Sequence, residues 1–262
     1  MIAFTQQQLD AWLLQFLWPF ARMLALVGSA PLFSESTIPV RVKVGMAFVL
    51  TMAVAPGLAP APAIPPGSFA GLWLLGQQVL VGIAMGFTMR IVFAAVQTAG
   101  EFVGLQMGLS FASFFDPATG ANTAVLSRLF NIMAMLVFLA LDGHLLVLAA
   151  LVRSFEALPL AETALDPNGW GILVHWGQAI FVSGLLLALP LICALLTINL
   201  AMGILNRAAP QLSVFAVGFP VSLITGLLLL AVVLPQAAPF LENLLRAGLE
   251  AVADVIAGLA GQ

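Results

Sequence analysis

Few residues of this sequence carry the chemistry that enzymes use. The only lysine, Lys43, lies in the segment VRVKVG, which has no glycine-rich loop before it and so does not predict a phosphate-binding loop of the P-loop kind. The two histidines, His144 and His175, lack the carboxylate and the paired histidine of a metalloprotease helix. The single cysteine, Cys193, lies in an apolar run, which predicts a small buried residue rather than a disulfide or a metal ligand.

A serine nucleophile is also disfavoured. The segment Gly108-Leu109-Ser110-Phe111 begins like a nucleophile elbow, but Ala112 stands where that motif needs its second glycine. The eight cations are scattered along the chain, and the net charge of −3 gives no footprint for nucleic acid. We therefore expect no enzyme, no catalytic residue, no metal, no cofactor and no nucleic-acid partner.

The composition indicates a polytopic membrane protein surrounded by lipid. Hydrophobic residues make up 62% of the 262 residues and charged residues only 7%. Soluble domains contain roughly 25% charged residues, so this sequence cannot supply a water-facing surface of the usual kind.

Long apolar runs predict an all-α fold of helical hairpins with bent or broken helices. They lie near residues 11–33, 44–59, 69–99, 125–141, 145–152, 170–205 and 212–234. A span of a hydrocarbon core about 30 Å thick needs about 20 residues. As single helices, Phe69–Ala99 would measure roughly 46 Å and Trp170–Leu205 roughly 54 Å. Pro190 predicts a kink or a break in the second of these.

Three connecting or terminal segments have distinct patterns. Ala55–Ser68 contains five prolines and predicts an extended linker. Leu165–Trp170, LDPNGW, predicts a turn. Gln236–Gln262 carries charged residues every four positions opposite apolar ones, which predicts an amphipathic helix.

Four polar residues inside apolar runs are candidates for buried contacts between helices or subunits: Arg22, Arg90, Gln97 and Glu101. Charges there cannot face lipid at low cost, and glycines at four-residue spacing beside them permit close helix packing. Arg90 has an available partner in Glu101. A polar track for substrate or ions is the alternative, and a structural contact is favoured over it.

The stretch GLSFASFFDPATGANTAVLSR, residues 108–128, interrupts the apolar pattern. One interpretation is a loop at the membrane surface that its aromatic side chains anchor. The other is a constriction made by Phe111, Phe114 and Phe115, because irregular backbone at membrane depth must be buried in protein or line a cavity. The residues alone favour neither.

Three segments carry a resemblance to a known family: FLWPFARMLALVGSAPLFSESTIPVRVKVGMAF, GEFVGLQMGLSFASFFDP and FLALDGHLLVLAALVRSFEALPL. In this order they resemble the FliR family of type III secretion export-gate proteins over essentially the whole chain. GLQMGLSFASFFDP and LDGHLL look like the flagellar rather than the virulence branch.

The resemblance implies a subunit of a helical hetero-oligomeric export gate, not an enzyme. Members assemble with FliP and FliQ into a gated conduit for unfolded flagellar proteins, with FlhB associated and FlhA nearby. The part of the chain at about 1–165 would resemble a FliP subunit, and the part at about 166–262 a FliQ-like helical hairpin. The complex lies in the bacterial inner membrane within the flagellar basal body and projects partly into the periplasmic space.

The resemblance also implies that the loop acts as a plug in the closed channel. The corresponding residues here are Gly108, Leu109, Phe111, Phe114, Phe115, Asp116 and Gly120. The alternatives are a self-contained secondary transporter or the equivalent subunit of a virulence type III secretion system.

Overall fold

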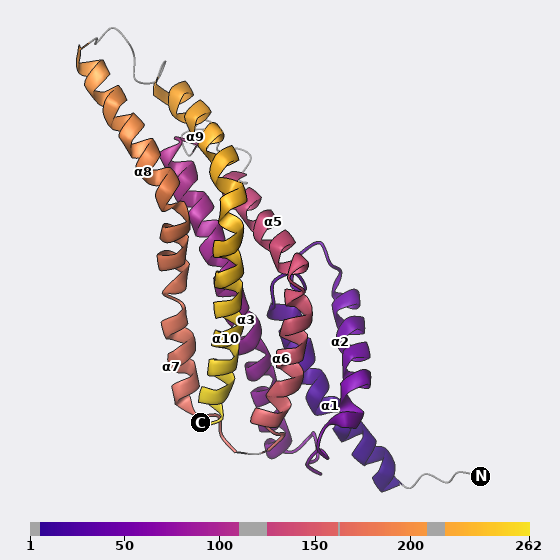
Figure 1. Cartoon of the computed structure of the whole chain (residues 1–262). Helices are drawn as coiled ribbons and strands as arrows, with labels where there is room; N and C mark the ends of the chain where they lie inside the picture. The colour runs from indigo at the N-terminus through magenta and orange to yellow at the C-terminus, as the bar shows by residue number, and fades with distance from the viewer. Residues whose placement is uncertain (1–5, 110–124, 162, 209–217) are drawn as a thin grey trace. The chain divides into compact units, whose positions relative to one another are not determined.

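The computed structural model describes residues 6–109, 125–161, 163–208 and 218–262, and these contain helices and no strand. The predicted all-α fold is confirmed. The α-helices are α1 (Gln6–Ser29), α2 (Val40–Val54), α3 (Phe69–Gln106), α5 (Val125–Ala140), α6 (Gly143–Ala157), α7 (Pro167–Trp176), α8 (Ala179–Ala208), α9 (Phe219–Val233) and α10 (Ala238–Leu259) (Figure 1). The described residues also form two short 3-10 helices, η1 (Ala55–Gly57) and η4 (Leu234–Ala237).

Five helical segments of the described residues are long and apolar enough to cross a membrane, and α5 with α6 would make a sixth. These last two are bent by 67° at their junction. The first over-long run is one continuous helix, since α3 has 38 residues and therefore measures about 57 Å, nearly twice a hydrocarbon core of about 30 Å.

The second over-long run, Trp170–Leu205, is interrupted at a different residue from Pro190, where the sequence predicted a kink or a break. Pro190 lies inside α8, whose helix continues to Ala208, so of the two expected effects, a kink or a break, the break does not occur. A kink at Pro190 stays a prediction. The interruption is at Gly177–Gln178, between α7 and α8. A proline removes only one backbone donor, and apolar helices of the membrane kind tolerate that loss.

The chain forms two compact units, each built from separate stretches. The first unit comprises Met1–Ile91, Asp142–Gly177 and Arg246–Gln262. The second comprises Val92–Leu141 and Gln178–Leu245. These units are defined by contacts within the chain. The predicted division near residue 165 is a different one, because it separates a FliP-like part from a FliQ-like part, and it stays a prediction.

In the first unit, glycines let α3 approach α1 closely. A Cβ on Gly82 would collide with the Arg22 carbonyl oxygen and lie 2.7 Å from the Cβ of Ala25. A Cβ on Gly86 would collide with the side chain of Ser29. The close packing that the glycine spacing predicted is therefore present along this part of α3.

Gln15 on α1 holds the proline-rich linker. Its Nε2 donates to the Ala55 carbonyl at 3.0 Å, and its Oε1 accepts from the Ala61 N–H. The linker has no helix or strand of its own after Gly57, so this one carboxamide supplies hydrogen-bond partners to backbone groups that no regular element pairs, the Ala61 N–H among them.

The predicted turn LDPNGW is in fact the start of α7. Asp166 is its N-cap, with the side chain accepting from the Asn168 N–H at 2.8 Å, and Pro167 occupies the first turn. Residues that favour turns also favour helix N-termini, because a capping carboxylate and a proline both suit that position.

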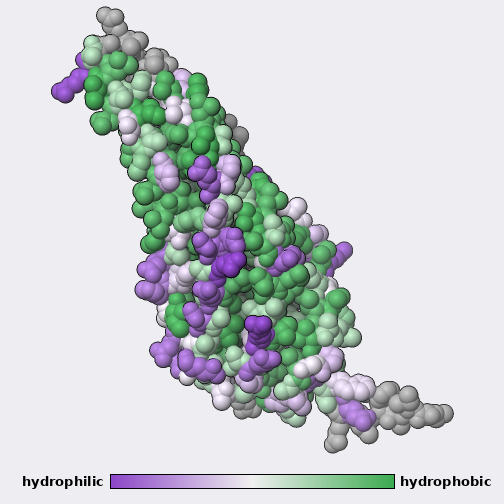
Figure 2. Space-filling view, in the orientation of Figure 1, coloured by the Kyte–Doolittle hydropathy of each residue, from purple (hydrophilic) through white to green (hydrophobic). Residues whose placement is uncertain are grey.

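The predicted amphipathic helix at the C-terminus is confirmed as α10. Its apolar positions are buried: Leu241, Leu245, Val252, Val255 and Ile256. Arg246, Glu250 and Asp254 are exposed on the opposite side. Figure 2 shows hydrophilic residues gathered over the helix, between broad hydrophobic areas.

In the second unit, α3 packs against α5 and α8 through two further glycines. A Cβ on Gly100 would lie 2.5 Å from the Ser127 Cα, and a Cβ on Gly184 would lie 2.8 Å from the Ala95 carbonyl oxygen. Cys193 on α8 is exposed, so its expected burial was wrong. A helix that is apolar all round does not reveal which of its faces is covered.

Candidate functional site

The segment that the sequence singled out begins where α3 ends. The Leu109 N–H donates to the Gly104 carbonyl at 3.0 Å, and the Gly108 N–H donates to the Leu105 carbonyl at 3.1 Å. This pair of bonds is a Schellman motif, which needs a left-handed residue after the helix. Gly108 supplies it with a φ of 77°. Gly108 therefore turns the chain out of α3 at the point where the loop starts.

The two helices that flank the loop are bonded to each other. Ser127 on α5 donates its Oγ–H to the Gln97 carbonyl at 2.9 Å. The Gln97 Nε2 in turn donates to the Asn131 Oδ1 at 2.9 Å. With the close approach at Gly100, these bonds join α3 to the first turns of α5 in the second unit.

Only part of the predicted plug lies in the described residues. Gly108 and Leu109 form the helix end, as above. The remaining five lie outside the described residues: Phe111, Phe114, Phe115, Asp116 and Gly120. The aromatic constriction accordingly stays a prediction.

Arg22 is the most buried charge that the structure describes, with 1% of its surface exposed. Its Nε donates to the Gln78 Oε1 at 2.8 Å. Its Nη1 donates to the carbonyl oxygen and to the Oγ of Ser154 at 2.9 and 3.0 Å, and its Nη2 donates to the Leu158 carbonyl at 2.9 Å. Arg22 thus joins α1 to α3 and α6 within the first unit.

The end of α6 provides the negative potential at this site. Ser154 and Leu158 belong to the last turn and the C-cap of α6, whose carbonyls carry a partial negative charge of about half a unit. The guanidinium also lies 4.1 Å from the ring centroid of Phe155, a cation–π distance. Arg22 consequently caps a helix that is remote from it in the sequence.

The sequence pointed to Arg22 but not to its partners. Gln15 and Ser29 share its helical face, yet Gln15 binds the linker and Ser29 donates to the Ala25 carbonyl at 2.7 Å. Gln78 could have been identified from the sequence as a candidate partner, because a carboxamide within an apolar run needs a buried hydrogen-bond partner. Nothing in the sequence placed Ser154 or Leu158 beside Arg22.

The other predicted contact residues have different surroundings. Arg90 and Glu101 are both exposed in this chain. Gln97 is exposed as well, although it bonds to Asn131. Contacts of these three with other subunits stay predictions.

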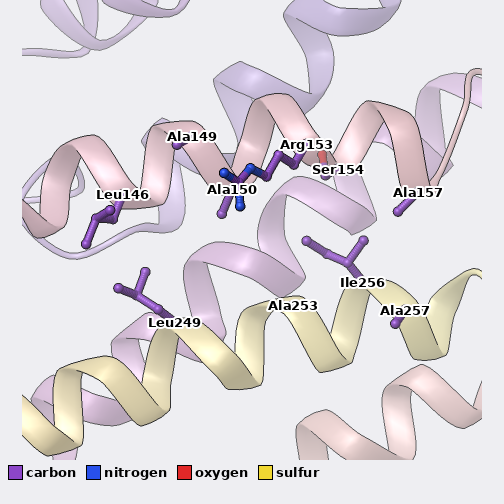
Figure 3. A pocket seen from close by; sticks show the side chains of 10 residues that line it. All are labelled: Leu146, Ala149, Ala150, Arg153, Ser154, Ala157, Leu249, Ala253, Ile256 and Ala257. Carbon is purple, nitrogen blue, oxygen red and sulfur yellow. The ribbon is translucent and has the colours of Figure 1, made fainter.

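A groove of about 320 Å³ lies between α6 and α10 in the first unit, and Figure 3 shows its lining. Small side chains from both helices dominate it: Ala149, Ala150, Ala157, Ala253 and Ala257. Its polar members are Arg153 and Ser154, and Ser154 is already bonded to Arg22. This lining offers no nucleophile with a base beside it, and the described residues contain no group of three or more His, Cys, Asp or Glu that could hold a metal ion.

These features define a class of protein: an all-helical membrane-type chain whose polar residues join helices and mark helix ends. Residues 13–248 match the family described as "Bacterial export proteins, family 1". The chain belongs to this family.

Three relatives that share one name illustrate the similarity. The flagellar biosynthetic protein FliR of Escherichia coli strain K12 is 49% identical over 259 residues, which cover 99% of each chain. The protein of the same name from Pectobacterium carotovorum is 47% identical with the same coverage. The one from Bacillus subtilis strain 168 is 28% identical over 245 residues, 92% of this chain and 94% of the relative.

Proposed function

We propose that this chain is a core channel subunit of the flagellar type III protein export gate and is needed for flagellum assembly. With FliP and FliQ it forms a gated conduit for unfolded flagellar proteins, next to FlhB and FlhA. The conduit lies in the bacterial inner membrane within the basal body and reaches partly into the periplasmic space. The observation that carries this proposal is the end-to-end match to proteins named flagellar biosynthetic protein FliR.

The exposed apolar surface supports a role inside a larger assembly. Within the second unit, α8 and α9 expose many large hydrophobic side chains, among them Phe181, Leu186, Leu200, Ile204, Leu228 and Val232. Patches of this kind mark contact with lipid or with another protein. Partner subunits and membrane lipid together cover these side chains in the proposed complex.

The loop that begins at Gly108 acts as the plug of this conduit. Support comes from the helices on either side, which the Ser127–Gln97 bond joins. A plug needs a stable attachment, and the contacts between α3 and the start of α5 support one. The glycine at the α3 end is a suitable pivot, since glycine adopts many backbone conformations at low cost.

The chain has no catalytic role in this proposal and needs no cofactor. The sequence around Lys43 lacks a phosphate-binding loop, so the energy for export comes from another component in this proposal.

The transporter alternative receives less support. A transporter of this kind predicts a discontinuous-helix site and an inverted repeat, and the sequence indicates neither, although prolines at positions 190 and 220 were candidates for breaks in helices. Pro190 lies within continuous α8, and Pro220 lies in the first turn of α9, where proline is compatible with a helix. The virulence alternative is disfavoured because the relatives carry a flagellar name.

The test of the plug is to shorten the loop between Gly108 and Asn122 in the assembled complex. We expect small ions and solutes to leak across the inner membrane, because the aromatic constriction is lost. Conductance in planar bilayers and uptake of a small dye by cells would measure the leak.

A matched control keeps the loop length and replaces Phe111, Phe114 and Phe115 by leucine. This variant retains apolar bulk and should leak far less than the shortened loop. Unchanged conductance after shortening, in a complex that is made in normal yield, would count against the plug.

A further inference from the structure

The groove between α6 and α10 has no role in the function proposed above. All of its lining residues belong to the first unit and to the part of the chain that the structure describes. Residues at helical spacing form the α10 wall, which runs from Leu249 through Ala253 to Ala257 (Figure 3). This wall is about 12 Å long, or about two helical turns.

The two walls are shaped to receive another helix. Small side chains recur on both of them, at Ala150 and Ala157 on α6 and at Ala253 and Ala257 on α10. Small residues at helical spacing let a neighbouring helix approach closely, and packed helices lie about 8–10 Å apart. Ala253 is exposed, so this chain does not cover the stripe by itself.

Charged residues border the groove. Arg153 belongs to its lining, and Glu156 is exposed three positions further along α6. Glu250 and Asp254 are exposed on α10, each one position after a lining residue. Arg246, one turn before the groove, already takes part in another interaction. The three acids would repel the phosphate of a lipid head group and attract a partner with basic side chains.

We propose that this groove binds one helix of a partner subunit. The helix presents a stripe of apolar side chains to the alanines and an acidic side chain to Arg153. Basic side chains on its two flanks face the three acids that border the groove. Because the occupant belongs to the export gate, this inference rests on the proposed function.

The test measures whether the groove is covered, and by what. Ala253→Cys introduces a thiol into the α10 wall, in a chain whose single native cysteine carries the substitution Cys193→Ala. The rate of reaction with a water-soluble maleimide is compared in three samples: the isolated chain in detergent, the isolated chain in lipid nanodiscs, and the purified complex with FliP and FliQ. Labelling after unfolding in SDS gives the total thiol.

We expect fast labelling of the isolated chain in both media and labelling slower by about tenfold or more in the complex, because a packed helix excludes water and reagent. Slow labelling in nanodiscs without partners would show that lipid covers the groove. Slow labelling of the isolated chain only at high concentration would show that a second copy covers it. Either result, or equal rates in the complex and in the isolated chain, would overturn the proposal.

Substitutions test the shape and the charge of the partner helix. Ala253→Leu fills the groove and should weaken partner binding by about tenfold, whereas Ala253→Ser keeps a small side chain and should bind normally. Glu250→Lys combined with Asp254→Lys should also weaken binding, and by more than Glu250→Gln combined with Asp254→Gln. All these positions are exposed, and thermal unfolding of the isolated chain checks that each variant folds.

Mass spectrometry of the purified complex gives the amounts of FliP and FliQ per tagged chain. Normal amounts of both with Ala253→Leu, or with the two lysines, would overturn the proposal. A complex made in normal yield whose introduced thiol reacts as fast as in the isolated chain counts against the groove alone. A chain that binds neither FliP nor FliQ counts against the proposed function as well, so the two failures are distinguishable.

Discussion

At the scale of single residues, Arg22 determines how α6 ends. Its two backbone acceptors lie 132 and 136 positions further along the chain. A helix end normally finds its capping groups in the residues next to it or in water. Here a side chain from α1 does this, so the stability of the α6 end depends on the position of α1.

We predict that Arg22→Met lowers the free energy of unfolding by about 2–4 kcal/mol, because buried acceptors on Gln78 and Ser154 lose their charged donor. Chemical denaturation of the full chain in detergent would measure this loss. Arg128→Met, at an exposed arginine of α5, is the control and should be nearly neutral. If both variants unfolded like the unsubstituted chain, Arg22 would not have the capping role.

Arg90 gives a different expectation, because its side chain is exposed in this chain. We predict that Arg90→Leu leaves the unfolding of the isolated chain unchanged and lowers the yield of complex with the partner subunits. Affinity purification of the complex and an export assay on the purified fraction would measure the two effects. A normal yield with blocked export would instead favour the polar track for substrate or ions.

The sequence was sufficient to choose Arg22 and not to find what it binds. A charge in an apolar run identifies a residue that must be buried in protein. Its acceptors are backbone carbonyls, which every residue has, and no side-chain pattern distinguishes the carbonyls of Ser154 and Leu158 from others.

At the scale of elements, glycines determine how closely α3 approaches its neighbours. Gly82 and Gly86 face α1, and Gly100 faces α5. No described residue lies within 4 Å of the place where a Cβ on Gly104 would be. Spacing alone therefore does not show which glycines of the repeat are in contact.

This difference provides a matched pair of substitutions. We predict that Gly100→Ala destabilises the chain by about 1–3 kcal/mol, because the Ser127 backbone must move away. Gly104→Ala should be neutral or stabilising by up to about 1 kcal/mol, since alanine is the better helix former. Thermal unfolding of both variants would test this, and equal effects would show that α3 and α5 are not in tight contact there.

A helix could be predicted from the sequence where one of its faces is charged and the opposite face is apolar. The four-residue spacing of charges indicated α10 correctly. The start of α7 was mistaken for a turn because Asp166 and Pro167 suit both. The sequence of α8 is apolar on all sides, so it did not show that Cys193 is exposed or that the helix continues through Pro190.

At the scale of the whole molecule, the exposed apolar surface requires other components. Besides α8 and α9, α2 exposes Val42, Phe48, Val49 and Met52 and buries only Ala47 and Thr51. Single chains in water rarely expose contiguous surfaces of this kind. The composition predicted such surfaces, but it could not predict how contacts divide the chain into two discontinuous units.

We predict that a tagged full chain, extracted in mild detergent, brings FliP and FliQ with it in a constant ratio. A gate subunit is built into one assembly, whereas a transporter purifies by itself or as a homo-oligomer. Mass spectrometry of the purified material would measure the ratio, with a tagged unrelated inner-membrane protein as the control. Saturable uptake of a metabolite by vesicles containing only this chain would contradict the proposed function.

The distance between Arg22 and its acceptors also has a consequence for biosynthesis. Ribosomes add roughly 5–20 residues per second, so the interval between synthesis of Arg22 and of Leu158, 136 residues later, is roughly 7–27 s. During that interval the nascent first helix carries a cation whose acceptors on α6 have not all been made. Water, lipid head groups or the insertion machinery must solvate it until then, so the bonds that join Arg22 to α6 form only after α6 has been translated.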